Sequence, residues 1–254
     1  MISVVIIGLG NIGSHLYTAF SKLDNVSVVM LYNRTEEALL PFKNKVKTTT
    51  DGNQLPDADI YIIATSDDSI AAVSKQLSLK NKLVVHTSGS VSIAVLDDKN
   101  RKGSFYPLQT FSKGATVNFK EIPICIEAED KADEALLLQL AESVSNNVHK
   151  ISSEQRKSMH LAAVFVNNFS NHLYHIGQEI CEENKVPFSI LSPLIQETVT
   201  KLNKLSPFNA QTGPAKRNDT GTMQRHLTEL TNNTHKEIYS VISKSITNTY
   251  GKKL

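Results

Sequence analysis

Short apolar runs alternate with segments of helical periodicity from the first residues to about residue 151. The runs are continuous and rich in Val and Ile, as in strands buried on both faces of a parallel sheet. The predicted strands are 2–7, 26–32, 45–49, 58–64, 82–86, 122–127 and 148–151. The predicted helices are 11–23, 35–42, 69–77 and 131–145. This alternation predicts an α/β fold with a doubly wound parallel sheet.

The pattern changes near Ser152. Beyond it no segment is typical of a strand, and helical periodicity covers 154–184, 188–205 and 223–250, with a polar loop over 206–222. The sequence therefore predicts a nucleotide-binding domain over residues 1–152 and an all-α domain over residues 153–254. The helices carry more apolar surface than so small a domain needs, so we expect a homodimer.

Charge and composition exclude several classes of function. The chain has 254 residues, with 27 basic and 25 acidic side chains, and this balance argues against a nucleic-acid binder. No apolar run is long enough for a membrane span, and no signal peptide is recognised. Cys125 and Cys181 lie far apart, which predicts neither a disulfide framework nor a zinc site. We expect a cytoplasmic protein with no metal.

A glycine pattern stands where the first predicted strand meets the first predicted helix. Gly8, Gly10 and Gly13 form G-x-G-x-x-G. Gly8 permits the tight turn, Gly10 lets the backbone approach a pyrophosphate, and Gly13 lets the helix pack close to the strand. The first helical residues, Asn11 and Ile12, offer N–H groups to the phosphates. The context predicts a Rossmann dinucleotide site; the alternative is an ordinary glycine-rich turn.

The end of the second strand indicates which dinucleotide binds. NAD sites usually carry a carboxylate there for the ribose 2′-hydroxyl, but this strand ends in Asn33, Arg34 and Thr35. Arg34 can pair with a 2′-phosphate, and its two neighbours can donate hydrogen bonds to it. This favours NADP over NAD, unless Arg34 is merely a surface residue.

Two further loops follow strands at the same predicted edge of the sheet. Thr65 and Ser66 follow the strand 58–64, and Ser88 follows the strand 82–86. Ligands of doubly wound sheets cross the carboxyl ends of the strands, so these side chains are predicted to line the cofactor. A role as helix caps is the alternative for such residues.

The glycine turn, the Asn33–Thr35 segment and the strand 58–64 together resemble one superfamily. It contains pyrroline-5-carboxylate reductase, ketopantoate reductase, the β-hydroxyacid dehydrogenases and deazaflavin-dependent NADP reductases. The resemblance implies a Rossmann domain, a C-terminal helical domain and the use of NADP.

Three more segments, 86–90, 107–111 and 212–219, with His226 downstream, are similar to a narrower family. Its members join a Rossmann-like domain to a helical domain of unknown function and are labelled NADP oxidoreductases. One feature departs from the superfamily. Several of its enzymes place a catalytic lysine one turn before an asparagine on the first long helix, whereas this chain has Ala163 and Val164 one turn before Asn167 and Asn168. Those activities are therefore not transferred.

Four polar residues of the second domain are candidates for the chemistry. His160 and Asn167 lie seven positions apart, which places them on one face of an α-helix that could look into a cleft between the domains. Lys216 could clamp an anionic substrate, with Asp219 orienting it. The alternatives are polar residues on a helix surface and an aspartate that caps a helix beside surface cations.

These residues predict an NADP(H)-dependent oxidoreductase that acts on a small anionic carbonyl, imine or hydroxy compound between the two domains. Two alternatives stay open. One is a non-catalytic module that senses NADP(H), which the missing lysine favours. The other is a deazaflavin-dependent NADP reductase, whose second cofactor would replace the substrate.

Overall fold

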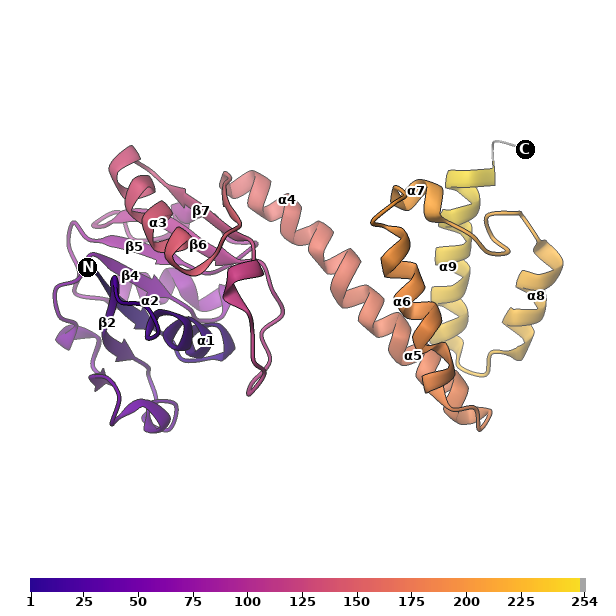
Figure 1. The fold of residues 1–254 in the computed structure, drawn as a ribbon, viewed down its shortest axis with the longest axis horizontal. Helices are drawn as coiled ribbons and strands as arrows, with labels where there is room; N and C mark the ends of the chain where they lie inside the picture. Colours follow the sequence, from indigo (N-terminus) through magenta and orange to yellow (C-terminus); the bar gives the residue numbers. More distant parts are fainter. Residues whose placement is uncertain (252–254) are drawn as a thin grey trace. The chain divides into compact units, whose positions relative to one another are not determined.

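The computed structural model describes residues 1–251, and the chain forms two compact units, Met1–Val164 and the residues from Phe165 onward. The first unit is built on one eight-stranded sheet (Figure 1). Its strand order is β3-β2-β1-β4-β5-β6-β7-β8, and every neighbouring pair is parallel except β6 and β7. The strands are β1 Ile2–Ile7, β2 Val26–Tyr32, β3 Thr48–Thr49, β4 Ile60–Ile63, β5 Leu83–His86, β6 Arg101–Pro107, β7 Ile124–Ala128 and β8 Val148–Lys150. The predicted doubly wound α/β fold is confirmed.

Alternating side chains of the sheet pack against helices on both faces. Val4 and Ile6 belong to a buried cluster with residues of α1 and α3, whereas Val5 and Ile7 belong to a second cluster with residues of α2. A strand buried on both faces is apolar at every position, which explains the continuous runs in the sequence. The helices of this unit are α1 Asn11–Phe20, α2 Ile70–Gln76, α3 Lys131–Val144 and α4 Ser153–Ala163.

Three parts of the first unit differ from the prediction. Strand β6 was not predicted, because it begins with Arg101 and Lys102, whose charges are paired with Asp133 and Asp98 in the fold. The predicted helix over 35–42 is a series of turns with one short 3₁₀ segment, Leu40–Phe42. So short a segment, with a proline near its end, has little intrinsic helical stability. The predicted strand 45–49 shrinks to β3.

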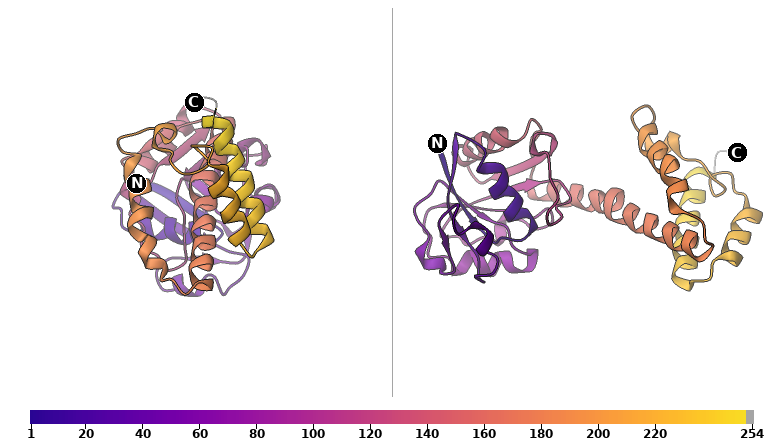
Figure 2. Two further views of the ribbon diagram at one scale, coloured as in Figure 1. Left: turned by 90° about the vertical axis from the view of Figure 1, so that its right-hand side faces the viewer. Right: turned by 60° about the horizontal axis from the view of Figure 1, so that its bottom comes forward.

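The second unit contains only helices within its described residues, as predicted. They are α5 Ser170–Glu183, α6 Ser192–Lys201, α7 Pro207–Ala210, α8 Thr220–Glu229 and α9 Asn233–Tyr250. The predicted last helix, 223–250, is in fact α8 and α9, which lie side by side (Figures 1 and 2). The side chain of Asn232 accepts the first N–H groups of α9 and starts that helix anew.

The long predicted helix 154–184 consists of α4, a π-helical segment Val164–Phe169 and α5. The predicted domain division at Ser152 falls at the N-cap of α4, whereas the compact units divide after this helix. The predicted division places α4 in the second domain, whereas the compact units place it in the first. No helix within residues 1–251 is both long and apolar enough to cross a membrane.

Candidate functional site

The turn between β1 and α1 leaves no room for side chains at two of its glycines. Gly8 has a φ of +94°, and a Cβ there would lie 2.7 Å from Thr65 Cγ2 and 2.8 Å from the carbonyl oxygen of Ala64. A Cβ on Gly13 would collide with the carbonyl oxygen of Gly8. The first turn of α1 therefore lies directly against the ends of β1 and β4, as the glycine pattern predicts.

Gly10 differs from these two glycines because the space beside it is open. It is the N-cap of α1, no side chain caps the helix there, and a Cβ on Gly10 would meet no atom within 4 Å. The first N–H groups of an α-helix have no acceptor within the helix, and its N-terminus carries a partial positive charge. This end of α1 can therefore bind an anion such as a diphosphate.

The residues after β2 hold the glycine turn and leave one cation exposed. The Leu9 N–H donates to Asn33 Oδ1 at 3.1 Å, and Asn33 Nδ2 donates to the carbonyl and hydroxyl oxygens of Thr35 at 3.0 and 3.1 Å. Asn33 and Thr35 thus shape the turn. Arg34 is exposed, and its guanidinium has no hydrogen bond or ion pair with any residue that the structure describes. A guanidinium without a partner can pair with a phosphate group.

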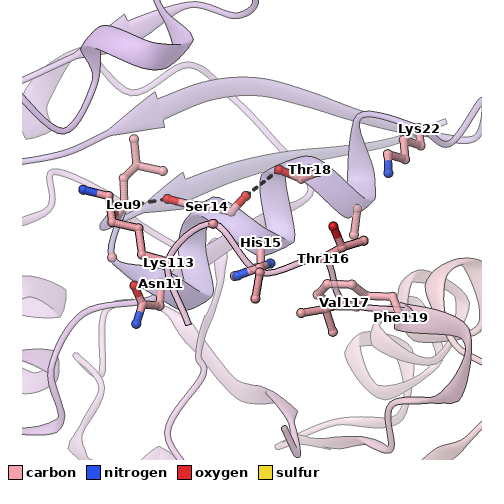
Figure 3. A pocket seen from close by; sticks show the side chains of 14 residues that line it. Leu9, Asn11, Ser14, His15, Thr18, Lys22, Lys113, Thr116, Val117 and Phe119 are labelled. Carbon is pink, nitrogen blue, oxygen red and sulfur yellow. Dashed lines mark hydrogen bonds between the residues drawn. The ribbon is translucent and has the colours of Figure 1, made fainter. Parts of the chain in front are cut away.

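A hollow of about 530 Å³ runs along the outer side of α1 from the glycine turn (Figure 3). The loop over 113–119 forms its other wall. This loop is tied to α1 because Asn11 Nδ2 donates to the Phe111 carbonyl at 2.9 Å and His15 Nε2 lies 3.0 Å from the Ser112 carbonyl oxygen. The amide of Asn11 therefore positions a loop, and only its backbone N–H stays available for the predicted phosphate contact.

The loop after β4 contains a buried hydroxyl without a partner. Thr65 Oγ1 has no hydrogen bond to any described residue, although it is buried beside the glycine turn. Buried polar atoms are normally paired, so this hydroxyl fits a ligand that would occupy the turn. Ser66 Oγ donates to Ser69 Oγ at 3.1 Å, which agrees with the alternative that Ser66 shapes the start of the next helix.

The loop after β5 is built around two polar residues. His86 is fully buried, and its Nδ1 accepts the Ser88 N–H at 3.2 Å. Burial, followed by the charge of Arg156, lowers the pKa of His86 to about 4, so this histidine is neutral near pH 7. Ser88 Oγ accepts the N–H groups of Ser90 and Val91, both at 3.1 Å. The predicted cofactor residue Ser88 therefore also fixes the shape of its loop.

Arg156 anchors α4 to this loop and was not predicted as part of the site. Its side chain is 0% exposed and forms an ion pair with Glu127 on β7. Its Nε donates to the Ser88 carbonyl at 3.1 Å, and its Nη2 donates to the Val91 carbonyl at 2.6 Å. Helical periodicity gave no signal for it, because a charged residue on an amphipathic helix is expected to face solvent.

One turn further along α4, His160 meets the end of β6. Its Nδ1 lies 3.0 Å from the hydroxyl of Tyr106, and the two rings meet edge to face with centroids 6.0 Å apart. Burial raises the pKa of Tyr106 to about 12. A Cβ on Gly89 would lie 2.6 Å from His160 Nδ1 and 2.7 Å from Tyr106 Cζ. Of these three residues, only His160 was a predicted catalytic residue.

The other three candidate catalytic residues belong to the second compact unit. Asn167 is exposed and lies on the π-helical segment of the second unit. The π-helix has a wider turn than the α-helix, so seven residues no longer measure two α-helical turns, and the shared face predicted for His160 and Asn167 rests on a periodicity that the helix does not keep.

Lys216 and Asp219 both have partners within the second unit. Lys216 Nζ donates to the Gln211 carbonyl at 2.7 Å and lies 5.5 Å from the centre of the Tyr250 ring. Asp219 Oδ1 accepts the Thr222 N–H at 3.0 Å, which caps α8 and lowers the pKa of Asp219. These contacts match the structural alternative, and catalytic roles for both residues stay predictions. Within residues 1–251, no group of three His, Cys, Asp or Glu side chains could hold a metal ion.

Two family models match the chain. One describes coenzyme F420-dependent NADP oxidoreductases and matches residues 3–89. The other describes a domain of unknown function, DUF2520, and matches residues 122–246. The first match covers the glycine turn and the loops after β2, β4 and β5. A search of curated proteins gave no match.

Solved structures match over nearly the whole chain. A putative NADP oxidoreductase from Bacteroides fragilis is 38% identical, with 97% of this chain and 98% of that chain covered and a TM-score of 0.86. An imine reductase from Myxococcus stipitatus in complex with NADP⁺ is 16% identical, with 97% and 92% covered and a TM-score of 0.64. A pyrroline-5-carboxylate reductase from Coxiella burnetii is 18% identical, with 99% and 94% covered and a TM-score of 0.57. The last two likenesses concern the fold alone.

Proposed function

The chain belongs to the NADP oxidoreductase family that joins a Rossmann domain to a helical domain of unknown function, and from this premise we propose that it uses NADP(H) to reduce or oxidise a small anionic carbonyl, imine or hydroxy compound. The observation that carries the proposal is the open N-terminus of α1. It has an uncapped first turn and free space beside Gly10. These features suit a diphosphate.

The chain's own residues fit the remaining parts of NADP(H). Arg34 can pair with the 2′-phosphate because its guanidinium is exposed and has no partner among the described residues. The hydroxyl of Thr65 lies buried and unpaired beside the turn. When bound, the cofactor would supply or accept a hydride, and the protein would orient the substrate and exchange one proton. His160 is the candidate for that proton, because it lies where β5 and β6 end.

The first prediction concerns cofactor choice. Fluorescence titration should show that the protein binds NADPH more tightly than NADH. Arg34→Asp should reverse this preference, because a carboxylate repels the 2′-phosphate and accepts a hydrogen bond from the ribose 2′-hydroxyl. Arg217→Asp is the matched control, since Arg217 is an exposed arginine of the second unit. An unchanged NADPH to NADH ratio in Arg34→Asp would remove Arg34 from the site.

The family model over residues 3–89 supports a second candidate, a deazaflavin-dependent NADP reductase. A single panel of keto acids, cyclic imines and a deazaflavin distinguishes the two candidates by NADPH oxidation. Turnover of a carbonyl or imine compound supports the first proposal, and turnover of the deazaflavin alone supports the second. Tight NADPH binding with no turnover of any compound would instead support a sensor, which the missing lysine of the superfamily motif favours.

We also propose that the second unit forms a homodimer with a second copy of the chain. Within its described residues, only Ile176 and Ala215 are buried apolar side chains. So small a core cannot stabilise a domain of this size alone, and a partner must cover its apolar surface. A second copy is the partner that is always present, and symmetric contacts between two copies are the commonest form of oligomer. The exposed large apolar side chains of this unit include Phe165, Val166, Phe169, Leu173, Ile190, Leu194, Val199 and Val241.

Light scattering coupled to gel filtration tests the homodimer. The wild-type protein should have twice the chain mass, and Val166→Lys should shift it toward the monomer because Val166 is 75% exposed and would bring a charge into the interface. Leu40→Lys is the control, because Leu40 is also an exposed aliphatic residue, 58% exposed, but belongs to the first unit. A wild-type monomer at micromolar concentration would overturn the homodimer.

A further inference from the structure

We propose that Tyr106 is a positioning residue that fixes the neutral tautomer of His160, so that the hydrogen on Nε2 is the one presented to the substrate. This inference rests on the proposed oxidoreductase function. It adds a second residue to the proton-transfer site and names the atom of His160 that exchanges the proton.

The hydrogen bond between Tyr106 and His160 has one possible donor. A phenol has one O–H donor, and the Tyr106 hydroxyl has one hydrogen-bond partner within the described chain, His160 Nδ1 at 3.0 Å. Tyr106 is 8% exposed, and a buried hydroxyl that did not donate its hydrogen would be left unsatisfied. The phenol therefore donates and Nδ1 accepts. The neutral ring of His160 must then carry its own hydrogen on Nε2.

Tyr106 is uncharged near pH 7. Burial raises its pKa to about 12, so the phenol keeps its hydrogen throughout the neutral range. The donor role of Tyr106 thus does not change near pH 7, and Nε2 stays the protonated atom of neutral His160. His86 cannot take this role, since its ring is fully buried.

Gly89 leaves the space that the rings of His160 and Tyr106 occupy. A Cβ at this position would lie closer than van der Waals contact to both His160 Nδ1 and Tyr106 Cζ. The hydrogen bond between the two rings therefore requires a glycine in the loop after β5. The buried ion pair of Arg156 with Glu127 holds the same helix against this loop and fixes the position of His160 one turn away.

Tyr106 and His160 lie at the edge of the sheet where the parallel strands end. Arg34, at the end of β2, marks the side where the adenosine half of a dinucleotide would bind. The other half then lies beyond β1 toward β4 and β5, whose neighbour is β6. Tyr106 lies two residues past the β6 partner of His86, which is the last residue of β5, so it stands at this same carboxyl edge.

In the reductive direction, His160 and Tyr106 together deliver one proton to the substrate. A bound reduced nicotinamide would supply the hydride, and the substrate oxygen would then need one proton. The Nε2 hydrogen of His160 moves to that oxygen, and the hydroxyl hydrogen of Tyr106 moves to Nδ1. The pKa of Tyr106 is about 12, and its phenolate is a weaker base than an alkoxide. The net transfer of the proton from Tyr106 to the substrate oxygen is therefore favourable. The phenolate regains its proton from water.

Nitrogen NMR of the cofactor-free protein tests the tautomer without any substrate. Long-range ¹H–¹⁵N spectra distinguish Nε2–H from Nδ1–H, and His160→Gln identifies the signals of His160 among the eight histidines. We expect the Nε2–H form in the wild type and a mixture of forms in Tyr106→Phe. Tyr17→Phe is the matched control, since Tyr17 is also 8% exposed. A wild-type Nδ1–H form, or no change in Tyr106→Phe, would overturn the proposal.

Gly89→Ala provides a second test that keeps both rings. Its methyl group should separate them and produce the same loss of the Nε2–H form. In turnover with a substrate from the panel above, Tyr106→Phe should lower kcat by about tenfold or more, while the Kd for NADPH stays unchanged. An unchanged kcat would overturn the positioning role even if the tautomer is as expected. Failure of the wild type to bind NADPH would contradict the oxidoreductase function but would leave the tautomer result standing.

Discussion

Replacing Gly10 by aspartate should abolish NADPH binding without lowering the stability of the fold. Gly10 is the N-cap of α1 in an extended conformation, with φ −70° and ψ −162°, and a Cβ there would meet no atom within 4 Å. Aspartate is a preferred N-cap residue, and its carboxylate would accept the free N–H groups of the first turn. The same carboxylate would occupy the diphosphate position and repel it. We expect the affinity for NADPH to fall by about 100-fold or more, equal to about 2.7 kcal/mol.

The control for Gly10→Asp places the same charge on another helix of the first unit. Gln139 is an exposed residue of α3, and Gln139→Asp should change the Kd for NADPH by no more than about twofold, because exposed charges are screened by salt. Calorimetry should give the melting temperature of both variants. If Gly10→Asp binds NADPH as the wild type does, the diphosphate does not lie at the end of α1.

The second large effect is expected for the stability of the first unit. Arg156→Met should lower the free energy of unfolding by about 3–5 kcal/mol, because it leaves the Glu127 carboxylate without its countercharge and two backbone carbonyls without their donor. Methionine keeps most of the volume of the side chain, so the loss reports on the charge and its hydrogen bonds. Chemical unfolding followed by circular dichroism measures it.

An exposed ion pair serves as the comparison for Arg156. Lys99 pairs with Asp97 at 3.2 Å, and the lysine side chain is 55% exposed. Lys99→Met should cost less than about 1 kcal/mol, as is typical of surface pairs. Equal losses in the two variants would mean that the Arg156 network does not hold α4 on the sheet.

The sequence predicted those strands whose pattern of apolar residues is set by burial alone. Strands β1, β4 and β5 are covered on both faces and are apolar except at Ser3 and His86, so nearly continuous runs identified them. Strand β6 lies between β5 and β7 but starts with two charged residues. Their partners, Asp133 and Asp98, are supplied by tertiary structure, and no local pattern indicates such pairing.

The candidate site likewise has one part that local sequence determines and one part that depends on tertiary structure. The glycine turn is local, because three glycines within six residues determine where α1 can start and how closely it can pack. The contacts of Arg156 and Tyr106 are not local: Arg156 and Ser88 are 68 positions apart, and Tyr106 and His160 are 54 positions apart. Only the folded sheet brings these residues together. The sequence could therefore predict the shape of the glycine turn but not the contacts of Arg156 and Tyr106.

A crystal structure of the protein with NADPH would test most directly whether the dinucleotide binds at the end of α1. We predict diphosphate oxygens within hydrogen-bonding distance of the N–H groups of Asn11 and Ile12, with the 2′-phosphate against the guanidinium of Arg34. Density for NADPH away from the glycine turn, or a turn that stays empty at saturating NADPH, would contradict the account.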